Sequence, residues 1–266
     1  MHMEPVTVIT IKTQSGTAGT MTNKYHLELM SEVKAHARQL SQSEKEKLQR
    51  YIGTNKIFYA MGADTQRKII KEWTKKHPDI TEPEYIELLS SLCQGDSVNE
   101  TSLASGLLES LPKLRTNVKP QHLDAWLNRA RGWAEVDSIC QSKFTAAELL
   151  TNWKEWKSLL TKLASDDNIH KKRASLVLLT KPVRDSEDTR LADLAFTNID
   201  KLKKEREILI TKAISWLLRD LIKHNRPRVE TYLKQNEDTL PRIALRETKT
   251  KLQTGRKTAA KTVRHN

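Results

Sequence analysis

The spacing of apolar residues constrains this chain most, because from about residue 22 to residue 253 it repeats with the period of an α-helix. Residues 146–163 show it clearly, as an apolar stripe that predicts inward packing: Ala146, Leu149, Leu150, Trp153, Trp156, Leu159, Leu160 and Leu163. Glycine and proline are sparse and fall where helices should end: Gly53, Gly62, Pro78, Gly95, Pro112, Pro120, Gly132, Pro182, Pro227 and Pro241. Spacings that fit a capping box occur at Ser43/Glu46, Thr81/Glu84 and Thr145/Glu148. The chain is therefore predicted to be all-α.

The two ends of the chain differ from this pattern. Residues 6–11 alternate as a strand would, but no second candidate strand exists to pair with them, and residues 15–19 read as a flexible joint. After Glu247 there is no acidic residue, and six cations form a loose basic run. We expect a flexible tail at 1–21, a helical domain at 22–253 and a basic tail at 254–266. The basic tail either grasps phosphates or is simply a solvated terminus.

Short helices with short joints favour stacked helix pairs. At about 40–47 residues for a HEAT-type pair, residues 22–253 would hold roughly five or six repeats. The repeat is not visible as self-similarity of the sequence. A solenoid of this kind has a long concave face, and a basic concave face suits a DNA duplex. The predicted fold is an all-α, HEAT-like helical-repeat solenoid with a concave basic DNA-binding face.

The charge of the chain points to a polyanionic partner. Lysine and arginine total 46 against 33 aspartate and glutamate residues, a formal net charge of +13. Such an excess attracts nucleic acid through counterion release and speeds the encounter. The alternative is a basic protein whose charge serves only solubility, since net charge carries no specificity.

Other residue types argue against several classes of protein. The two cysteines, Cys93 and Cys140, give neither a disulfide framework nor metal-ligand spacing, and the eight histidines are scattered. No recognisable cysteine or serine nucleophile constellation occurs, and we expect no metal and no cofactor. There is no apolar run of about 18 residues and no secretory signal, so we expect a cytoplasmic protein without a membrane segment.

The first candidate segment is 132–137. Trp133 and Asp137 are four residues apart, so on a helix they share a face and could approach one target together. The alternative is a core tryptophan beside a capping or surface aspartate.

The second candidate segment is 169–179, which beyond Arg173 is apolar nearly all round. Arg173 lies angularly among apolar residues, and an unpaired buried charge is expensive, so this arginine needs an anionic partner. A DNA phosphate would serve, and Lys172 beside it is a further candidate for DNA binding. A neighbouring carboxylate such as Asp137 would serve equally well, as a structural ion pair.

The third candidate segment is 212–223. Its apolar stripe leaves Trp216 on the opposite side, in line with Lys212, Arg219 and Lys223. Cations on phosphates and an indole against a sugar or base suit a surface that meets nucleic acid. The alternative is a tryptophan packed against a neighbouring helix.

Together these segments resemble the AlkD-type DNA alkylation repair glycosylases, a HEAT-like-repeat family, from roughly Tyr51 to Leu252. The family's catalytic Trp and Asp match Trp133 and Asp137, its active-site Arg matches Arg173, and its second catalytic Trp matches Trp216. The segment 246–248 resembles its closing repeat. One position departs from the pattern, since His170 stands where the family often has an aromatic residue. The family also contains members without detectable base excision.

The resemblance implies a glycosylase that excises cationic N3- or N7-alkylated purines from duplex DNA in base excision repair. Asp137 would stabilise positive charge at C1′ of the sugar and orient water. Trp133 and Trp216 would pack against the deoxyribose of the lesion, and Arg173 would hold a phosphate. A deep base pocket would not be needed, and we expect a monomer. A non-catalytic DNA-binding relative or a helical protein-binding scaffold are the alternatives.

Overall fold

The computed structural model describes residues 23–258, and every regular element in this range is an α-helix, apart from two isolated β-bridges. The first seven are α1 (Lys24–His36), α2 (Gln42–Ile52), α3 (Ala63–Lys76), α4 (Glu82–Cys93), α5 (Val98–Ser110), α6 (Pro112–Arg115) and α7 (Pro120–Leu127). The others are α8 (Gly132–Cys140), α9 (Ala146–Thr151), α10 (Trp153–Leu163), α11 (Ile169–Asp185), α12 (Thr189–Leu202), α13 (Ile208–Gln235) and α14 (Arg242–Thr254). The predicted all-α fold is confirmed. The expected N-terminal tail and residues 259–266 of the C-terminal tail lie outside the described residues.

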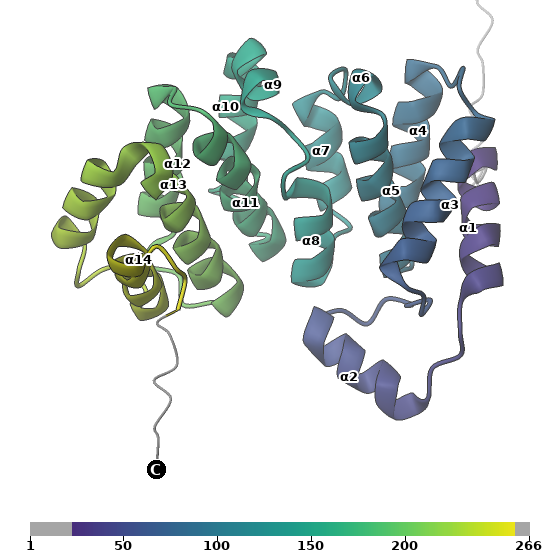
Figure 1. Ribbon diagram of the computed structural model, residues 1–266, viewed down its shortest axis with the longest axis horizontal. Helices are drawn as coiled ribbons and strands as arrows, with labels where there is room; N and C mark the ends of the chain where they lie inside the picture. Colours follow the sequence, from purple (N-terminus) through teal and green to yellow (C-terminus); the bar gives the residue numbers. More distant parts are fainter. Residues whose placement is uncertain (1–22, 259–266) are drawn as a thin grey trace, which may run out of the picture.

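The helices stand side by side in two layers along the molecule (Figure 1). In one layer each helix contacts the next in the series α3, α5, α8, α11, α13 and α14. In the other layer the series is α1, α4, α7, α10 and α12. This is the arrangement of a helical-repeat solenoid, as predicted.

The repeat appears in hydrogen bonds between neighbouring helix pairs rather than in the sequence. Lys172 bonds to Glu205, 33 residues away, and Arg173 bonds to Asp137, 36 residues away. Asn198 bonds to the carbonyl of Leu160, 38 residues away. The repeat is thus shorter than the 40–47 residues that we expected, because these helices and their joints are short.

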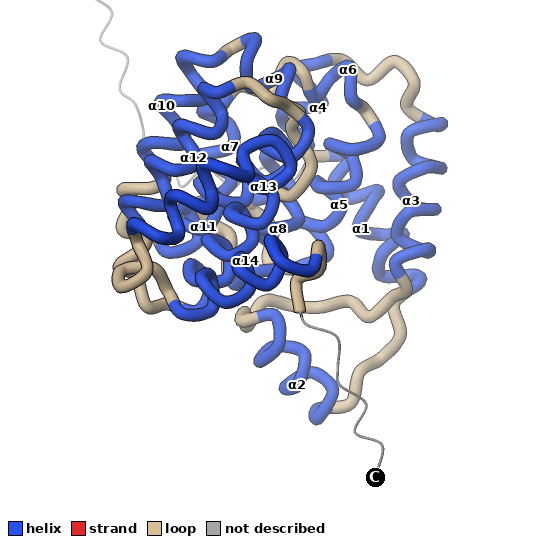
Figure 2. Tube along the Cα trace, turned by 60° about the vertical axis from the view of Figure 1, so that its left-hand side comes forward, coloured by secondary structure: helices blue, strands red, loops and turns tan. Residues whose placement is uncertain are grey.

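Helix α2 stands apart from the two layers. In Figures 1 and 2 it lies beyond the ends of the other helices, joined by residues 37–41 on one side and 53–62 on the other. Its last turn returns to the layers and contacts α8. The junction of α2 with α8 is therefore the place where this outlying helix is fixed.

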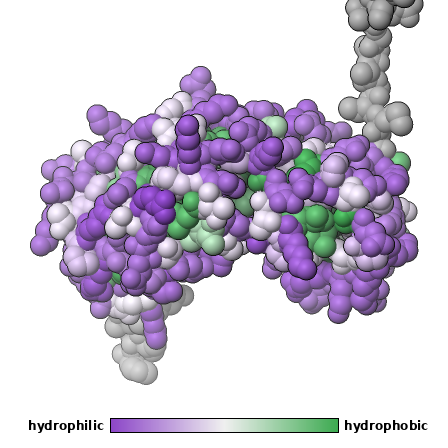
Figure 3. Space-filling view, turned by 90° about the horizontal axis from the view of Figure 1, so that it is seen from above, coloured by the Kyte–Doolittle hydropathy of each residue, from purple (hydrophilic) through white to green (hydrophobic). Residues whose placement is uncertain are grey.

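One continuous hydrophobic core fills the space between the layers. Among its largest side chains are Trp126, whose indole donates to Ser90 Oγ (2.9 Å), and Tyr85, whose hydroxyl donates to the carbonyl of Leu107 (3.3 Å). Polar residues cover most of the face seen from above, where hydrophobic residues show only in separate patches (Figure 3). Within residues 23–258, no helix combines the length and the apolar character needed to span a bilayer.

Most predicted helix ends are confirmed, and two are wrong. Gly53 ends α2 in a left-handed conformation, Pro112 and Pro120 begin helices, and Pro241 precedes α14. Pro182 instead lies in the last turn of α11, which continues to Asp185 because Val183 is buried in the core. Pro227 lies within α13, just after a kink at Asn225 (φ −127°, ψ 31°), where two helical segments meet.

The predicted capping boxes are likewise confirmed in part. The boxes at Thr81/Glu84 and Thr145/Glu148 are confirmed, but the first box is formed by Ser41 and Glu44, since α2 begins two residues earlier than predicted. Ser97 and Glu100 form a further box at α5. The apolar stripe at 146–163 packs inward but is divided between α9 and α10 at Asn152, whose backbone is not helical (φ −113°, ψ 44°).

Candidate functional site

The candidate residues come from α8, α11 and α13, three consecutive helices of one layer (Figure 1). Trp133 and Asp137 lie one turn apart on α8, which begins at Gly132. Arg173 lies in the second turn of α11, and Trp216 lies in the middle of the first part of α13. The solenoid thus places side by side three segments that are about 40 residues apart in the chain.

Asp137 and Arg173 form a bidentate ion pair. The Nε of Arg173 donates to Oδ1 of Asp137 (2.9 Å), and an Nη donates to Oδ2 (2.7 Å). The other Nη donates to the carbonyl of Leu209 at the start of α13 (2.6 Å). The side chains are 7% and 12% exposed for Arg173 and Asp137 respectively, so this pair links the three helices at the edge of the core. Of the two partners that the sequence left open for Arg173, the carboxylate is the one it has here.

The environment of Asp137 affects its protonation in opposing ways. Burial raises the pKa of its carboxyl above the ordinary 3.8, while the hydrogen bonds and charge of Arg173 oppose that rise. Each carboxylate oxygen keeps a further lone pair after the two bonds to Arg173. A charged carboxylate in such a place is fixed in orientation and can act on positive charge nearby.

Trp133 faces the end of α2. Its indole nitrogen donates to the carbonyl of Tyr51 (2.7 Å), and the two rings meet edge to face with centroids 5.4 Å apart. Trp133 is half-buried, whereas Tyr51 is 69% exposed. The two aromatic rings therefore form one wall at the junction of α2 and α8, and Trp133 lies one helical turn before Asp137. Tyr51 was not predicted from the sequence.

Two glycines allow α2 and α8 to meet. Gly53 (φ 77°) ends α2 and Gly132 (φ 73°) begins α8, both in the left-handed region that favours glycine. A Cβ on Gly132 would lie 2.3 Å from the carbonyl oxygen of Ile52 and 2.9 Å from that of Gly53. The close backbone approach at Gly132 thus holds Trp133, the next residue, against Tyr51.

Replacing Gly132 with alanine is expected to destabilise the protein by roughly 2 kcal/mol or more, because it adds a backbone clash to left-handed strain. Gly255→Ala is the matched control, since a Cβ added to Gly255 (φ 71°) would meet no other atom and the variant bears only the left-handed strain. Urea unfolding of both variants measures the difference. Equal losses of stability in the two variants would show that the approach of Gly132 to Ile52 is not tight.

The predicted cationic side of α13 is only partly open. Lys212 and Lys223 are exposed, but Arg219 is only 16% exposed and lies 3.7 Å from the carboxylate of Glu247 on α14. Burial lowers the pKa of this arginine, and Glu247 opposes the shift. Trp216 is half-buried and packs against the core. Helix α14 thus covers part of this side, and Glu247 belongs to the segment that resembles the closing repeat.

Lys172 and His170 flank Arg173 on α11. Lys172 is paired with Glu205 (2.6 Å). His170 Nε2 accepts a hydrogen bond from the backbone N–H of Gly132 (3.4 Å), while its Nδ1 is buried without a partner among the described residues. Burial lowers the pKa of His170, with the Arg131 charge acting in the same direction. A neutral imidazole therefore faces the N-terminus of α8, at the position where the sequence departs from the family pattern.

The described residues contain no group of three or more histidine, cysteine, aspartate or glutamate side chains that could hold a metal ion. Cys93 and Cys140 are both buried as free thiols. A cavity of about 720 Å³ lies between α2 and residues 58–62 and is lined by Arg38, Leu48 and Phe58 among others. It lies beside the outlying helix and is not lined by Asp137 or Trp133.

Two comparisons point to one group of proteins. A family model described as "DNA alkylation repair enzyme" matches residues 29–252. A solved structure described as a predicted DNA alkylation repair enzyme from Enterococcus faecalis superposes with a TM-score of 0.61 at 19% identity, over 79% of this chain and 95% of that one. At that identity the superposition speaks for the fold. No curated protein matches the chain.

Proposed function

The chain belongs to the family of DNA alkylation repair enzymes, and from this premise we propose that it is a glycosylase that excises N3- or N7-alkylated purines from duplex DNA. The observation that carries the proposal is the carboxylate of Asp137, held by Arg173 one helical turn from Trp133. These are the residues that match the catalytic pattern of the AlkD-type glycosylases. We further propose that the protein acts as a cytoplasmic monomer without metal or cofactor.

Excision of such a base needs little acid catalysis from the protein. A purine alkylated at N3 or N7 is already cationic. The base takes both electrons of the glycosidic bond when that bond breaks, so it departs as a neutral molecule and is a good leaving group. Positive charge then grows at C1′ of the sugar, and a nearby carboxylate lowers the energy of that state. Asp137 supplies this charge and accepts a hydrogen bond from the attacking water.

The aromatic residues would supply selectivity. The electron-rich faces of Trp133 and Trp216 attract a cationic lesion and its sugar more strongly than a neutral nucleotide. Selection by the charge of the lesion would not require a deep base pocket. Tyr51 extends the wall that Trp133 begins, with its ring 69% exposed.

Arg173 can hold a phosphate without leaving Asp137. A guanidinium carries five N–H groups, and the bonds to Asp137 and Leu209 use three of them. The remaining N–H groups can donate to a backbone phosphate of the DNA and fix its register. The lysines Lys172, Lys212 and Lys223, with Arg219, would add contacts to phosphates along the duplex.

The test is release of base from duplex DNA that carries a single N7-methylguanine, with free base and abasic sites both counted. We expect release at a rate well above spontaneous depurination, and none from the matched undamaged duplex. A duplex with 3-methyladenine serves as a second substrate. No release from either lesion would contradict the proposal.

A second candidate function is DNA binding without excision, in a member of the same family. It is favoured by the full pairing of Asp137 with Arg173 and of the Trp133 indole with the Tyr51 carbonyl, which gives these groups a structural role. Binding of duplex DNA without release of either base would support this candidate.

Binding to DNA is expected to depend steeply on salt, through the exposed lysines of α13. Lys212→Gln and Lys223→Gln should each reduce the slope of log K against log[salt] by about 1, because each removes one phosphate contact. Lys154→Gln, which changes an exposed lysine on α10 in the other layer, is the matched control and should leave the slope unchanged. Equal effects at all three positions would argue against a DNA contact along α13.

A further inference from the structure

The segment that follows α2 is fixed to the layers at several points. The backbone N–H of Ile57 donates to the carbonyl of Asp96 (3.0 Å), and the carbonyl of Ile57 accepts from the N–H of Val98 (2.9 Å). The N–H of Tyr59 donates to the side chain of Asn99 (2.8 Å). These bonds all lead to the start of α5. Lys56 instead reaches α8, through its side chain.

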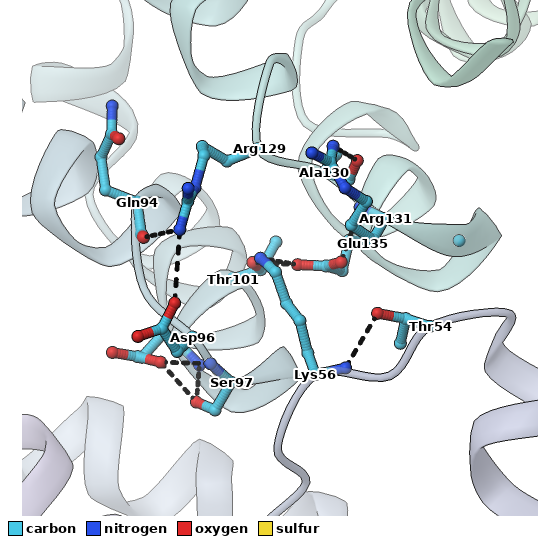
Figure 4. Close-up of polar contacts among 12 residues, drawn as sticks. Thr54, Lys56, Gln94, Asp96, Ser97, Thr101, Arg129, Ala130, Arg131 and Glu135 are labelled. Atoms are coloured by element: carbon cyan, nitrogen blue, oxygen red, sulfur yellow. Dashed lines mark hydrogen bonds and ion pairs between the residues drawn. The ribbon is translucent and has the colours of Figure 1, made fainter. Parts of the chain in front are cut away.

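The side chain of Lys56 is paired with a fully buried carboxylate. Its Nζ donates to Oε1 of Glu135 (2.7 Å), which also accepts from the hydroxyl of Thr101 (2.9 Å). The other oxygen of Glu135 accepts from the backbone N–H of Arg131 (2.7 Å). Figure 4 shows the Lys56 side chain running up from the linker to meet Thr101 and Glu135. The side chains of Glu135 and Lys56 are 0% and 10% exposed, so the two charges are largely removed from water and are paired with each other.

A buried ion pair contributes little net free energy to folding. Removing two charges from water costs about as much as their attraction returns, and an apolar pair of similar size often stabilises as well. A buried ion pair can instead define the position of the two segments that carry it, because either charge alone in that place is costly. Here the two segments are the linker after α2 and the first turn of α8.

The end of α2 and the linker that follows it hold α8 from two sides. Glu135 comes two residues after Trp133, so on the helix it points about 200° away from it. Tyr51 contacts Trp133 on one side and Lys56, five residues later, contacts Glu135 on the other. Gly53 and Gly132 meet between these two contacts. Residues 51–56 therefore clasp the first turn of α8.

We propose that Lys56 and Glu135 are positioning residues that fix the end of α2, and with it Tyr51, against Trp133. The proposal rests on the proposed function only in making this aromatic wall part of the surface that meets the lesion. Neither Lys56 nor Glu135 needs to touch DNA. Without the pair, α2 stays attached by its backbone but the Tyr51–Trp133 contact loosens.

The indole N–H of Trp133 reports on this contact directly. The chain has six tryptophans, and each indole gives one signal in an ¹H–¹⁵N correlation spectrum, where Trp133→Phe identifies the signal of interest. In Lys56→Met, which keeps the apolar stem of the lysine, we expect the Trp133 signal to shift or broaden while the other five stay in place. Lys45→Met removes an exposed lysine from α2 and should leave all six signals unchanged. Lys56→Arg, which keeps the cation, should return the Trp133 signal towards its original position.

A Trp133 signal that is the same in Lys56→Met and in the unchanged protein would overturn the inference. Displacement of all six signals would overturn it too, because the pair would then support the whole fold rather than the position of α2.

Base release separates this inference from the proposed function. For Lys56→Met we expect kcat/KM to fall about tenfold, as small misplacements of a site do, with less than about a twofold change in affinity for undamaged duplex. Lys45→Met should excise normally. If the unchanged protein releases no base, the proposed function fails, while the indole signal still decides the role of Lys56. Normal excision by Lys56→Met would overturn the positioning role and leave the glycosylase proposal intact.

Discussion

Asp137→Asn is expected to reduce the rate of base release by about a hundredfold or more. The amide keeps the size of the side chain but removes the negative charge that stabilises the sugar cation, and loss of one preorganised electrostatic group typically costs 10²–10³ in rate. Affinity for undamaged duplex should not fall, since the carboxylate repels phosphates rather than binding them. Single-turnover release of N7-methylguanine, measured beside duplex binding, gives both quantities.

The pH dependence of excision tests the same carboxylate. If Asp137 acts ionised, release by the unchanged protein should fall on the acid side as the carboxyl takes up a proton. Burial raises the pKa of Asp137, so this fall should begin above the ordinary 3.8 of an aspartate. The residual activity of Asp137→Asn should lack that acid limb. Undiminished release by Asp137→Asn would remove the carboxylate from the mechanism, whatever its pH profile.

Arg173→Met is expected to destabilise the fold by about 3–5 kcal/mol, the usual cost of leaving one partner of a buried ion pair unpaired. The free energy of unfolding in urea measures this loss. Arg173 also carries the hydrogen bond to Leu209, so its removal loosens α13 as well. Without the guanidinium, the pKa of Asp137 should rise further, because the hydrogen bonds and charge that opposed the effect of burial are gone.

A double variant distinguishes the ion pair from simple packing. Arg173→Met combined with Asp137→Leu removes both charges, and buried pairs replaced by apolar residues are often as stable as before. We therefore expect the double variant to recover most of the stability lost in Arg173→Met. A double variant as unstable as the sum of its single variants would mean that the two side chains contribute independently. Neither variant should excise bases.

The carboxyl of Asp137 also links stability to pH in a direction that can be worked out. Its folded pKa is raised above its value in the unfolded chain, so the folded state holds the proton more tightly. The stabilisation from this group is fully present at acid pH, below the unfolded pKa, and is lost as the pH rises through the folded pKa. Comparison with Asp137→Asn isolates this contribution from the other carboxylates.

The local pattern of the sequence determined the helices, because helix formation depends on neighbours three and four residues away. Thr81 and Thr145 could be identified as caps from spacing alone. Packing overrode a local rule at Pro182, which remains inside α11 because the helix around it is buried. At α2 the local rule left the cap open between Ser41 and Ser43, and Ser41 is the residue that caps the helix.

The candidate site, too, could be predicted from the sequence only in part. The spacing of Trp133 and Asp137 on one helix, and the need of Arg173 for an anion, follow from the sequence by itself. Which anion Arg173 meets depends on two helices 36 residues apart coming side by side, and no local rule contains that. Likewise the sequence placed Arg219 among open cations, and only the packing of α14 brings Glu247 to it.

The sequence by itself therefore determined that this chain is a row of helices and that it carries a large positive charge, while the assignment of site residues from the family resemblance stays a prediction. Only the tertiary structure decided the repeat length, the pairing of Asp137, and the clasp of residues 51–56 around α8. The reason is that periodicity fixes which face of a helix is apolar, whereas contacts between distant helices depend on packing. Lys56 and Glu135 look like ordinary surface charges until the fold brings them together, 79 residues apart, and buries them.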